Sequence, residues 1–132
     1  MSIGERLAAS DRDNADWQRD LFVSHTKLGD VLRAQGDLTG ALGAYRAGMS
    51  IAERLAASDR DNADWQRDLF ISLFNITTVL LKASDRGAAI PMAQRLDAQA
   101  KFLAERFPQD SQRNDYVRDA AYLLTQASRV AS

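Results

Sequence analysis

The sequence predicts an all-α chain made of repeated helical hairpins, and three observations carry that prediction. The 132 residues include 22 Ala and 15 Leu but only five each of Val, Ile and Thr, a balance that favours helices over strands. Residues 3–24 recur as residues 51–72 with two differences, which sets a period of 48 residues. Within each period, apolar residues recur at steps of three and four, the spacing of one helix face.

A third, diverged copy of the unit follows the first two. Ala104–Phe107 resembles Ala52–Leu55, and Tyr116–Asp119 resembles Trp65–Asp68. Because such units bury their apolar faces only by stacking on one another, the repeat predicts a right-handed superhelix (a solenoid) of antiparallel helix hairpins. The chain, a single domain over residues 1–132, then divides into units at about 3–50 and 51–98 and a partial unit at 99–132.

The first helix of the unit is expected from about Ala15 to Gln35. Asp13 and Asn14 precede it and can accept hydrogen bonds from its free amides, while Gly36 ends it because glycine adopts the left-handed conformation of a helix end. The chain has 15 Asp but only three Glu, and most of the aspartates crowd such helix starts. One face of this helix carries an apolar stripe of Trp17, Leu21, Leu28, Val31 and Leu32.

The second helix of the unit is expected from Leu38 to about Ser58, with Asp37 as its N-cap. In the second unit the corresponding helix is expected to start near Ala88, with Pro91 in its first turn. The apolar face of the helix in the first unit comprises Leu38, Ala41, Leu42, Tyr45, Met49, Ala52 and Leu55.

Both ends of the chain are expected to be incomplete hairpins. Ile3–Ala9 matches the latter half of a second-type helix, and the last helix, from about Gln112 to Val130, has no helix after it. Terminal repeats normally present a polar outer face, so we expect self-association, a partner or further repeats to cover the last helix. Its apolar stripe comprises Tyr116, Ala120, Leu123, Leu124, Ala127 and Val130.

Composition and motifs exclude several classes of function. A formal net charge of −1 gives no overall attraction to nucleic acid or to an anionic membrane, and no segment approaches the ~18 apolar residues of a membrane helix. The chain has no cysteine, and it lacks the phosphate-loop, dinucleotide and zinc-protease motifs. His25 has no Cys or carboxylate four residues away, which argues against a metal or acid–base role.

We therefore expect a chain that is not an enzyme and that uses no cofactor or metal. Glu5 and Arg6 interrupt the stretch where a signal peptide would be apolar, so the expected location is the cytoplasm.

Two recurring features have more than one interpretation. Trp17, Trp65 and Tyr116 occupy the same place in each unit and could stack on a ligand, although packing on the neighbouring hairpin is the simpler expectation. The pairs Arg19-Asp20, Arg67-Asp68 and Arg118-Asp119 also recur. They could form a charged binding strip or, as we favour, ion pairs between units, worth ~0.2–1 kcal/mol each when exposed.

One segment resembles a known family. Leu28-Gly29, Leu32, Gly36-Asp37, Ala41 and Tyr45 have the spacing of the tetratricopeptide repeat. The 48-residue period exceeds the family's unit of about 34 residues, and His25 stands where the family usually has Trp. The second unit departs further, with Thr77, Ser84 and Ala93 at the two glycine positions and the aromatic position.

The resemblance implies that the first helix of each hairpin lines a concave groove in which a protein or peptide segment binds. Thr26 and Asp30 stand where some family members have the Lys and Asn that clamp a terminal carboxylate, whereas Asn75 matches. The groove residues carried over by motif position are Val23, Thr26, Lys27, Asp30, Arg33, Ile71, Phe74, Asn75, Thr78, Leu81, Lys82, Tyr122, Gln126 and Arg129.

Two functions follow as expectations. The first is a module for protein–protein interaction that binds a peptide or protein segment in the groove, with apolar residues such as Phe74 suited to an amphipathic helix or an extended peptide. The second is a structural homo-oligomer assembled through the terminal helices, because near-identical units can exchange helices between copies. As an alternative to binding a ligand, the groove residues could pack against the next hairpin or a second copy.

Overall fold

The computed structural model describes the backbone of residues 3–129 and the side chains of residues 14–129. Over that part of the chain all regular structure is helical, which confirms the predicted all-α class. The five helices are α1 (Ile3–Ala34), α2 (Leu38–Ser58), α3 (Ala63–Lys82), α4 (Arg86–Arg106) and α5 (Arg113–Ser128).

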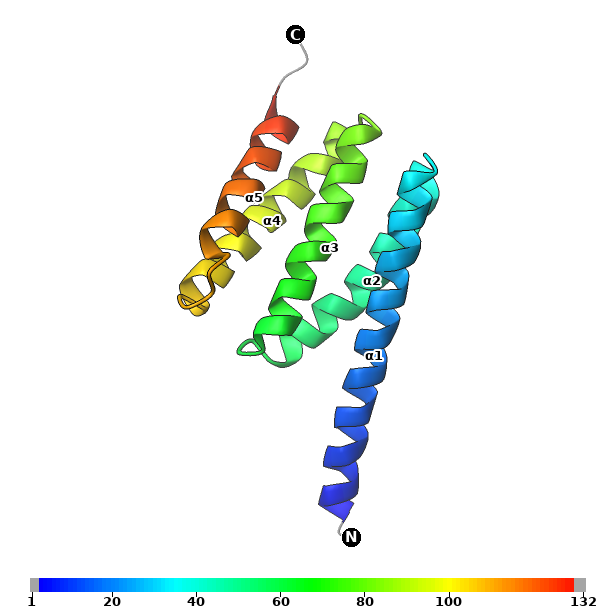
Figure 1. Cartoon of the computed structure of the whole chain (residues 1–132), viewed down its shortest axis with the longest axis vertical. Helices are drawn as coiled ribbons and strands as arrows, with labels where there is room; N and C mark the ends of the chain where they lie inside the picture. Colours follow the sequence, from blue (N-terminus) through cyan, green and yellow to red (C-terminus); the bar gives the residue numbers. More distant parts are fainter. Residues whose placement is uncertain (1–2, 130–132) are drawn as a thin grey trace.

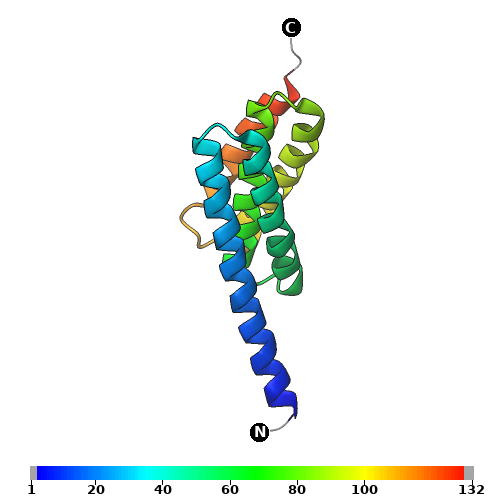
Figure 2. The ribbon, with the colours of Figure 1, turned by 90° about the vertical axis from the view of Figure 1, so that its right-hand side faces the viewer.

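Each helix packs against the helices that precede and follow it in the chain, α1 on α2, α2 on α3, α3 on α4 and α4 on α5. The result is two layers. Helices α1, α3 and α5 lie side by side in the front layer of Figure 1, and α2 and α4 lie behind the spaces between them. Figure 2, turned by a right angle, shows the same two layers edge-on. The N-terminal part of α1 extends beyond the other helices in both views.

Side-chain caps fix where three of the helices begin. The carboxylate of Asp37 accepts a hydrogen bond from the Gly40 amide at 2.8 Å, and Asp85 does the same for Ala88 at 3.1 Å. Asn62 caps α3 in the same way through the amide of Trp65. These caps satisfy amides that have no partner inside the helix, so the predicted start of α2 at Leu38 is confirmed.

The predicted start of α4 is wrong by two residues. The helix begins at Arg86, directly after its Asp85 cap, rather than near Ala88. Pro91 therefore lies in the second turn and not the first, where its missing N–H leaves the carbonyl of Gly87 without its usual donor from residue 91.

The predicted start of the first helix is also wrong. Helix α1 begins at Ile3 and runs without a break to Ala34, instead of starting near Ala15 after a turn. The eight residues Ser10–Trp17 are identical to Ser58–Trp65, yet the second copy leaves the helix at Asp59 and enters α3 at Ala63. One sequence thus adopts two conformations in one chain.

Contacts across the turn and with α4 hold the turn in the second copy. The side-chain amide of Gln66 donates to the carbonyl of Ala56 at 2.8 Å, Arg106 forms an ion pair with Asp61, and the guanidinium of Arg60 lies 4.2 Å from the centre of the Phe102 ring.

One period earlier, α2 has different side chains at the positions of these two α4 residues. Arg54 stands in place of Phe102, and Ser58 in place of Arg106. The two side chains that hold the turn in the second copy are thus replaced on α2, and α1 continues as a helix through the first copy.

The stripe of the last helix is covered, contrary to the expectation of an open face. Tyr116, Ala120, Leu123 and Ala127 are buried, and the first three pack with residues of α3 and α4. The helix runs from Arg113 to Ser128, slightly inside the predicted bounds. Val130, the last member of the predicted stripe, lies outside the described residues.

Helices α1 and α2 approach closely at one glycine. The Tyr45 side chain is buried on Gly29, where an added Cβ would lie 2.5 Å from the ring, and the Tyr45 hydroxyl donates to Asp30. Burial, with the hydrogen bond to Asp30, raises the pKa of Tyr45 to about 12. Gly43, in contrast, is an exposed helical residue with open space around it.

This pair gives a matched test of the packing. Gly29→Ala is expected to destabilise the chain by about 1–3 kcal/mol, because the methyl group displaces the Tyr45 ring. Gly43→Ala is expected to stabilise it by about 0.5–1 kcal/mol through helix propensity alone. Urea unfolding followed by circular dichroism measures both, and changes of the same sign would contradict the described contact.

Candidate functional site

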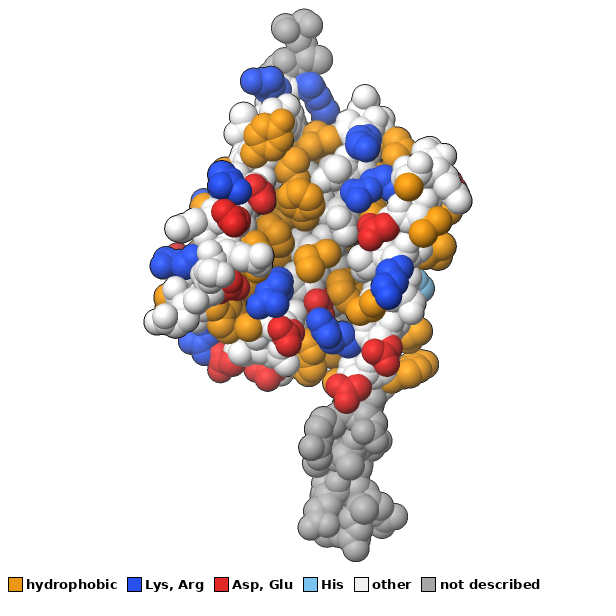
Figure 3. Space-filling model, in the orientation of Figure 1, with side chains coloured by type: hydrophobic (Ala, Val, Ile, Leu, Met, Phe, Trp, Pro, Cys, Tyr) orange, Lys and Arg blue, Asp and Glu red, His pale blue; other side chains and the backbone are white. Residues whose placement is uncertain are grey.

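The front layer of α1, α3 and α5 carries the residues that the sequence assigned to a groove. Figure 3 shows this face, with hydrophobic side chains gathered over its middle and charged side chains of both signs around them. Lys27, Asp30, Lys82, Tyr122 and Arg129 are exposed. The remaining predicted residues are half-buried, except Ile71, which is 37% exposed.

Several of the predicted residues already have partners within the chain. The hydroxyl of Thr26 donates to the Phe22 carbonyl, and that of Thr78 donates to the Phe74 carbonyl. Asp30 accepts from the Tyr45 hydroxyl, and Arg33 lies over the Tyr45 ring and 3.8 Å from Asp30. Thr26, Asp30 and Arg33 of α1 therefore already have partners within the chain. The apolar surface that is open to a ligand belongs to α3.

A hollow of about 380 Å³ lies between α3 and α5 on this face. Phe70 forms part of it, with its ring 4.9 Å from the Tyr116 ring and 6.1 Å from the Phe74 ring. Burial raises the pKa of Tyr116, whose hydroxyl donates to the Gln112 side chain. The lining residues are Phe70, Ile71, Phe74, Asn75, Gln112, Asp115, Tyr116, Arg118 and Asp119.

The structure brings together only part of the predicted set in this hollow. Ile71, Phe74 and Asn75 line it, whereas the predicted α5 residues Tyr122, Gln126 and Arg129 do not. The first turns of α5 supply its second wall instead. The recurring Arg118-Asp119 pair, for which a charged binding strip was the less favoured interpretation, lies in this wall.

The rim of the hollow carries exposed ion pairs. Arg118 lies 3.2 Å from Asp115 and 3.4 Å from Asp119. Exposed pairs of this kind are weak and rearrange easily, so charges of both signs are free to meet a ligand. The arrangement is an apolar floor with a mixed charged edge.

One of the expected ion pairs between units is confirmed. The guanidinium of Arg19 on α1 lies 2.9 Å from the carboxylate of Asp68 on α3. The equivalent Arg67 also joins two units, but through Asp110 in the loop before α5 and not through Asp119. It pairs with Asp64 in its own helix as well. Among the described residues, the ion-pair partners of Arg118 are Asp115 and Asp119 of its own helix, so the expectation is wrong for the third copy.

Burial decides the electrostatics of the Arg19–Asp68 pair. The Asp68 side chain is 7% exposed and that of Arg19 is 44% exposed. Desolvation raises the pKa of Asp68, against the opposing hydrogen bond and charge of Arg19, while that hydrogen bond raises the pKa of Arg19. The guanidinium of Arg19 thus offsets part of the desolvation cost of burying the Asp68 carboxylate.

The expectation that the recurring aromatic residues cover a neighbouring hairpin holds for two of the three. Tyr116 is buried, and half-buried Trp65 packs on the cluster of Phe22 and Leu55. Trp17 is 60% exposed, because α1 is not preceded by a hairpin within the described chain. His25 is half-buried and lies against Gly48 of α2, which favours a packing role.

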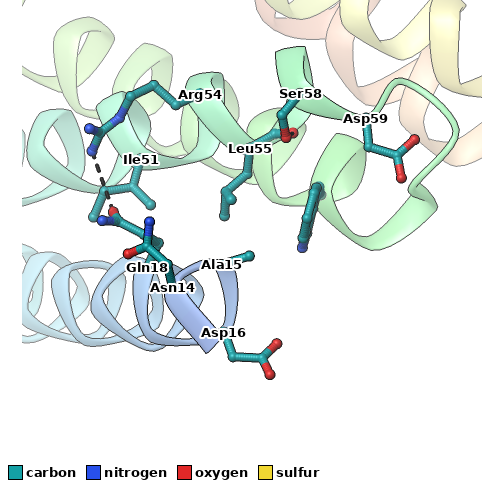
Figure 4. A pocket seen from close by; sticks show the side chains of 10 residues that line it. Asn14, Ala15, Asp16, Gln18, Ile51, Arg54, Leu55, Ser58 and Asp59 are labelled. Atoms are coloured by element: carbon teal, nitrogen blue, oxygen red, sulfur yellow. Dashed lines mark hydrogen bonds between the residues drawn. The ribbon is translucent and has the colours of Figure 1, made fainter. Parts of the chain in front are cut away.

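A second and larger hollow, of about 630 Å³, lies where α1, α2 and the start of α3 meet. Figure 4 shows Arg54 of α2 reaching toward Gln18 of α1, with the Nη2 and Oε1 atoms 3.4 Å apart. One period later, the equivalent Gln66 reaches the preceding turn. In the first copy α1 continues as a helix and has no equivalent turn. We interpret the hollow as the space that this turn would otherwise fill.

Among the residues that the structure describes, no group of His, Cys, Asp or Glu side chains could hold a metal ion, and no helix is long and apolar enough to cross a membrane. No protein-family model matches the chain, and no curated protein and no solved structure is detectably similar to it.

The Arg19–Asp68 pair yields a test that uses the repeat as its control. Arg19→Ala is expected to destabilise the chain by about 1–3 kcal/mol at neutral pH, because it leaves a buried carboxylate without its cation. Arg118→Ala, at the equivalent exposed position of the third copy, should cost less than about 0.5 kcal/mol.

The loss of stability caused by Arg19→Ala is also expected to depend on pH. Without Arg19 the pKa of folded Asp68 rises further above that of the unfolded chain, so stability is lost as the pH rises through the folded pKa. The cost of Arg19→Ala should therefore be small near pH ~4 and grow toward pH ~7. Urea unfolding across this range measures it, and a cost independent of pH would refute the role given to the pair.

Proposed function

We propose that the chain is a tetratricopeptide-like helical repeat module, a right-handed superhelix without catalytic activity, that binds a peptide or protein segment on the face of α1, α3 and α5. The near-exact repeat and the family-like residues of the first unit support this proposal. So does the sequential packing of the five helices, since repeat proteins of this kind contact only their neighbours.

The single observation that carries the proposal is the hollow between α3 and α5. Ile71 and Phe74 line the hollow and offer apolar surface to a ligand. The side-chain amide of Asn75 can both donate to and accept from a peptide backbone. A concave apolar site with a few polar groups at its edge is the common form of a peptide-binding groove.

The chemistry of the hollow indicates the class of ligand. A segment with one or two large apolar side chains would insert between the two helices. Flanking charges of either sign would meet Asp115, Arg118 and Asp119 at the rim. An amphipathic helix or an extended peptide has this pattern. A clamp for a terminal carboxylate is not favoured. The Asp30 carboxylate, which accepts a hydrogen bond from the Tyr45 hydroxyl, lies on the α1 part of the face and would repel a second carboxylate.

A peptide library displayed on phage, selected against the purified chain, tests the proposal. The selected peptides are expected to carry an apolar anchor with charged flanks, and fluorescence anisotropy measures their affinity. Ile71→Asp is expected to weaken binding by at least about tenfold, the loss of roughly one buried apolar contact of 1.4 kcal/mol.

The matched control is Val31→Asp on α1. Val31 is also an exposed aliphatic residue, but it does not line the hollow, so the affinity should be unchanged. A library that yields no binder would overturn the proposal. So would equal weakening by both variants, because the binding site would then lie outside the hollow.

A further inference from the structure

Helix α1 carries a second exposed face, distinct from the front layer. We call it the outer face of α1 and define it by Trp17, Asp20, Ser24, Leu28 and Val31. These residues follow one another at steps of three and four, so they share one side of the helix. Trp17, Leu28 and Val31 are 60%, 50% and 53% exposed, which makes them three of the five large hydrophobic residues exposed among those the structure describes.

The equivalent face of α3 is buried. One period later the same positions hold Trp65, Asp68, Ser72, Ile76 and Val79, four of them identical residues. Ser72, Ile76 and Val79 are 3%, 0% and 1% exposed. The difference arises because α3 has a helix on either side, whereas α1 packs mainly on α2, on one side. The outer face is therefore a helix-packing surface whose partner is absent from the described chain.

The charges on this side of α1 indicate what the partner is. Asp20 and Lys27 are both exposed and lie seven residues apart, about two helical turns along the same side. Asp20 lies about one helical turn before Ser24, and Lys27 lies about one turn after it. A second α1 running antiparallel would bring the Lys27 of each copy beside the Asp20 of the other, whereas a parallel copy in register would place like charges together.

The apolar residues fit the same arrangement. An antiparallel pair centred on Ser24 places Trp17 of one copy against Val31 of the other, and Leu28 beside the opposite Asp20. The small serine at the centre allows the two backbones to approach closely. Helix α1 forms the outer edge of the molecule in Figure 1, and hydrophobic side chains lie along that edge in Figure 3.

We propose that two copies of this chain pair through the outer faces of α1, antiparallel and related by a two-fold axis at Ser24. Such an interface is isologous, so each contact occurs twice. One helix on one helix buries less than a standard-size interface, so the dimer is weak, with a dissociation constant between about 1 and 100 μM. The hollow between α3 and α5 lies on other helices, so pairing and peptide binding are independent.

Cysteine crosslinking tests the register. The chain has no cysteine of its own, so each single-cysteine variant reports one position. Ser24→Cys is expected to form a disulfide-linked dimer under mild oxidation, because the two sulfur atoms meet at the axis. Ser50→Cys, at an exposed position of α2, is the control and should remain a monomer on a non-reducing gel.

Sedimentation or light scattering between about 1 and 200 μM tests the pairing itself. The wild-type chain is expected to change from monomer to dimer over this range. Val31→Asp should remain monomeric and Ile71→Asp should dimerise as the wild type does, with circular dichroism confirming that both fold. Asp20→Lys and Lys27→Asp should each weaken the dimer by about tenfold or more, and the double variant should restore it.

Three results would overturn the proposal. One is a monomer at every concentration. Another is a dimer that Val31→Asp does not weaken. The third is a dimer in which Ser24→Cys fails to crosslink, since the copies would then meet elsewhere, for example by exchanging the N-terminal part of α1. Loss of peptide binding by Ile71→Asp with pairing intact would separate this proposal from that of the groove.

Discussion

The structure depends on one constraint, that each helix buries its apolar side mainly against the helices adjacent to it in the chain. Helix α3 has two such neighbours and contributes nine buried residues, among them Phe70, Leu73 and Ile76. Helix α1 has one neighbour, and its outer face stays exposed although it repeats much of the α3 sequence. Position in the array, rather than composition, thus decides which apolar residues form core and which form surface.

Local signals in the sequence predicted much of the fold. Asp37 and Gly36 mark the turn before α2 through chemistry contained in a few residues, and the 48-residue repeat predicts antiparallel hairpins without reference to any partner. The start of α1 was not predictable in this way. The segment Ser10–Trp17 has the same residues as Ser58–Trp65, and only the contacts of Phe102 and Arg106 with the second copy hold a turn there.

The candidate site shows the same division. Ile71, Phe74 and Asn75 were predicted because they share one side of a helix, a property of spacing alone. The wall formed by the first turns of α5 was missed, because it depends on where the loop before Arg113 places that helix. Trp17 and Leu123 were misassigned for a related reason. Each lies at an end of the array, where the presence or absence of one neighbouring helix reverses the burial of a side chain.

The most direct test of this constraint is amide hydrogen exchange in the two copies of QRDLF, residues 18–22 and 66–70, where the amides of both copies are bonded within a helix. Their sequences are identical, so their intrinsic exchange rates are the same and any difference reports the free energy of local opening. At a concentration where the chain is monomeric, the copy in α3 is expected to exchange at least about tenfold more slowly, a difference of 1.4 kcal/mol or more. Equal exchange in both copies would contradict the account, because neighbours would then not decide the stability of each helix.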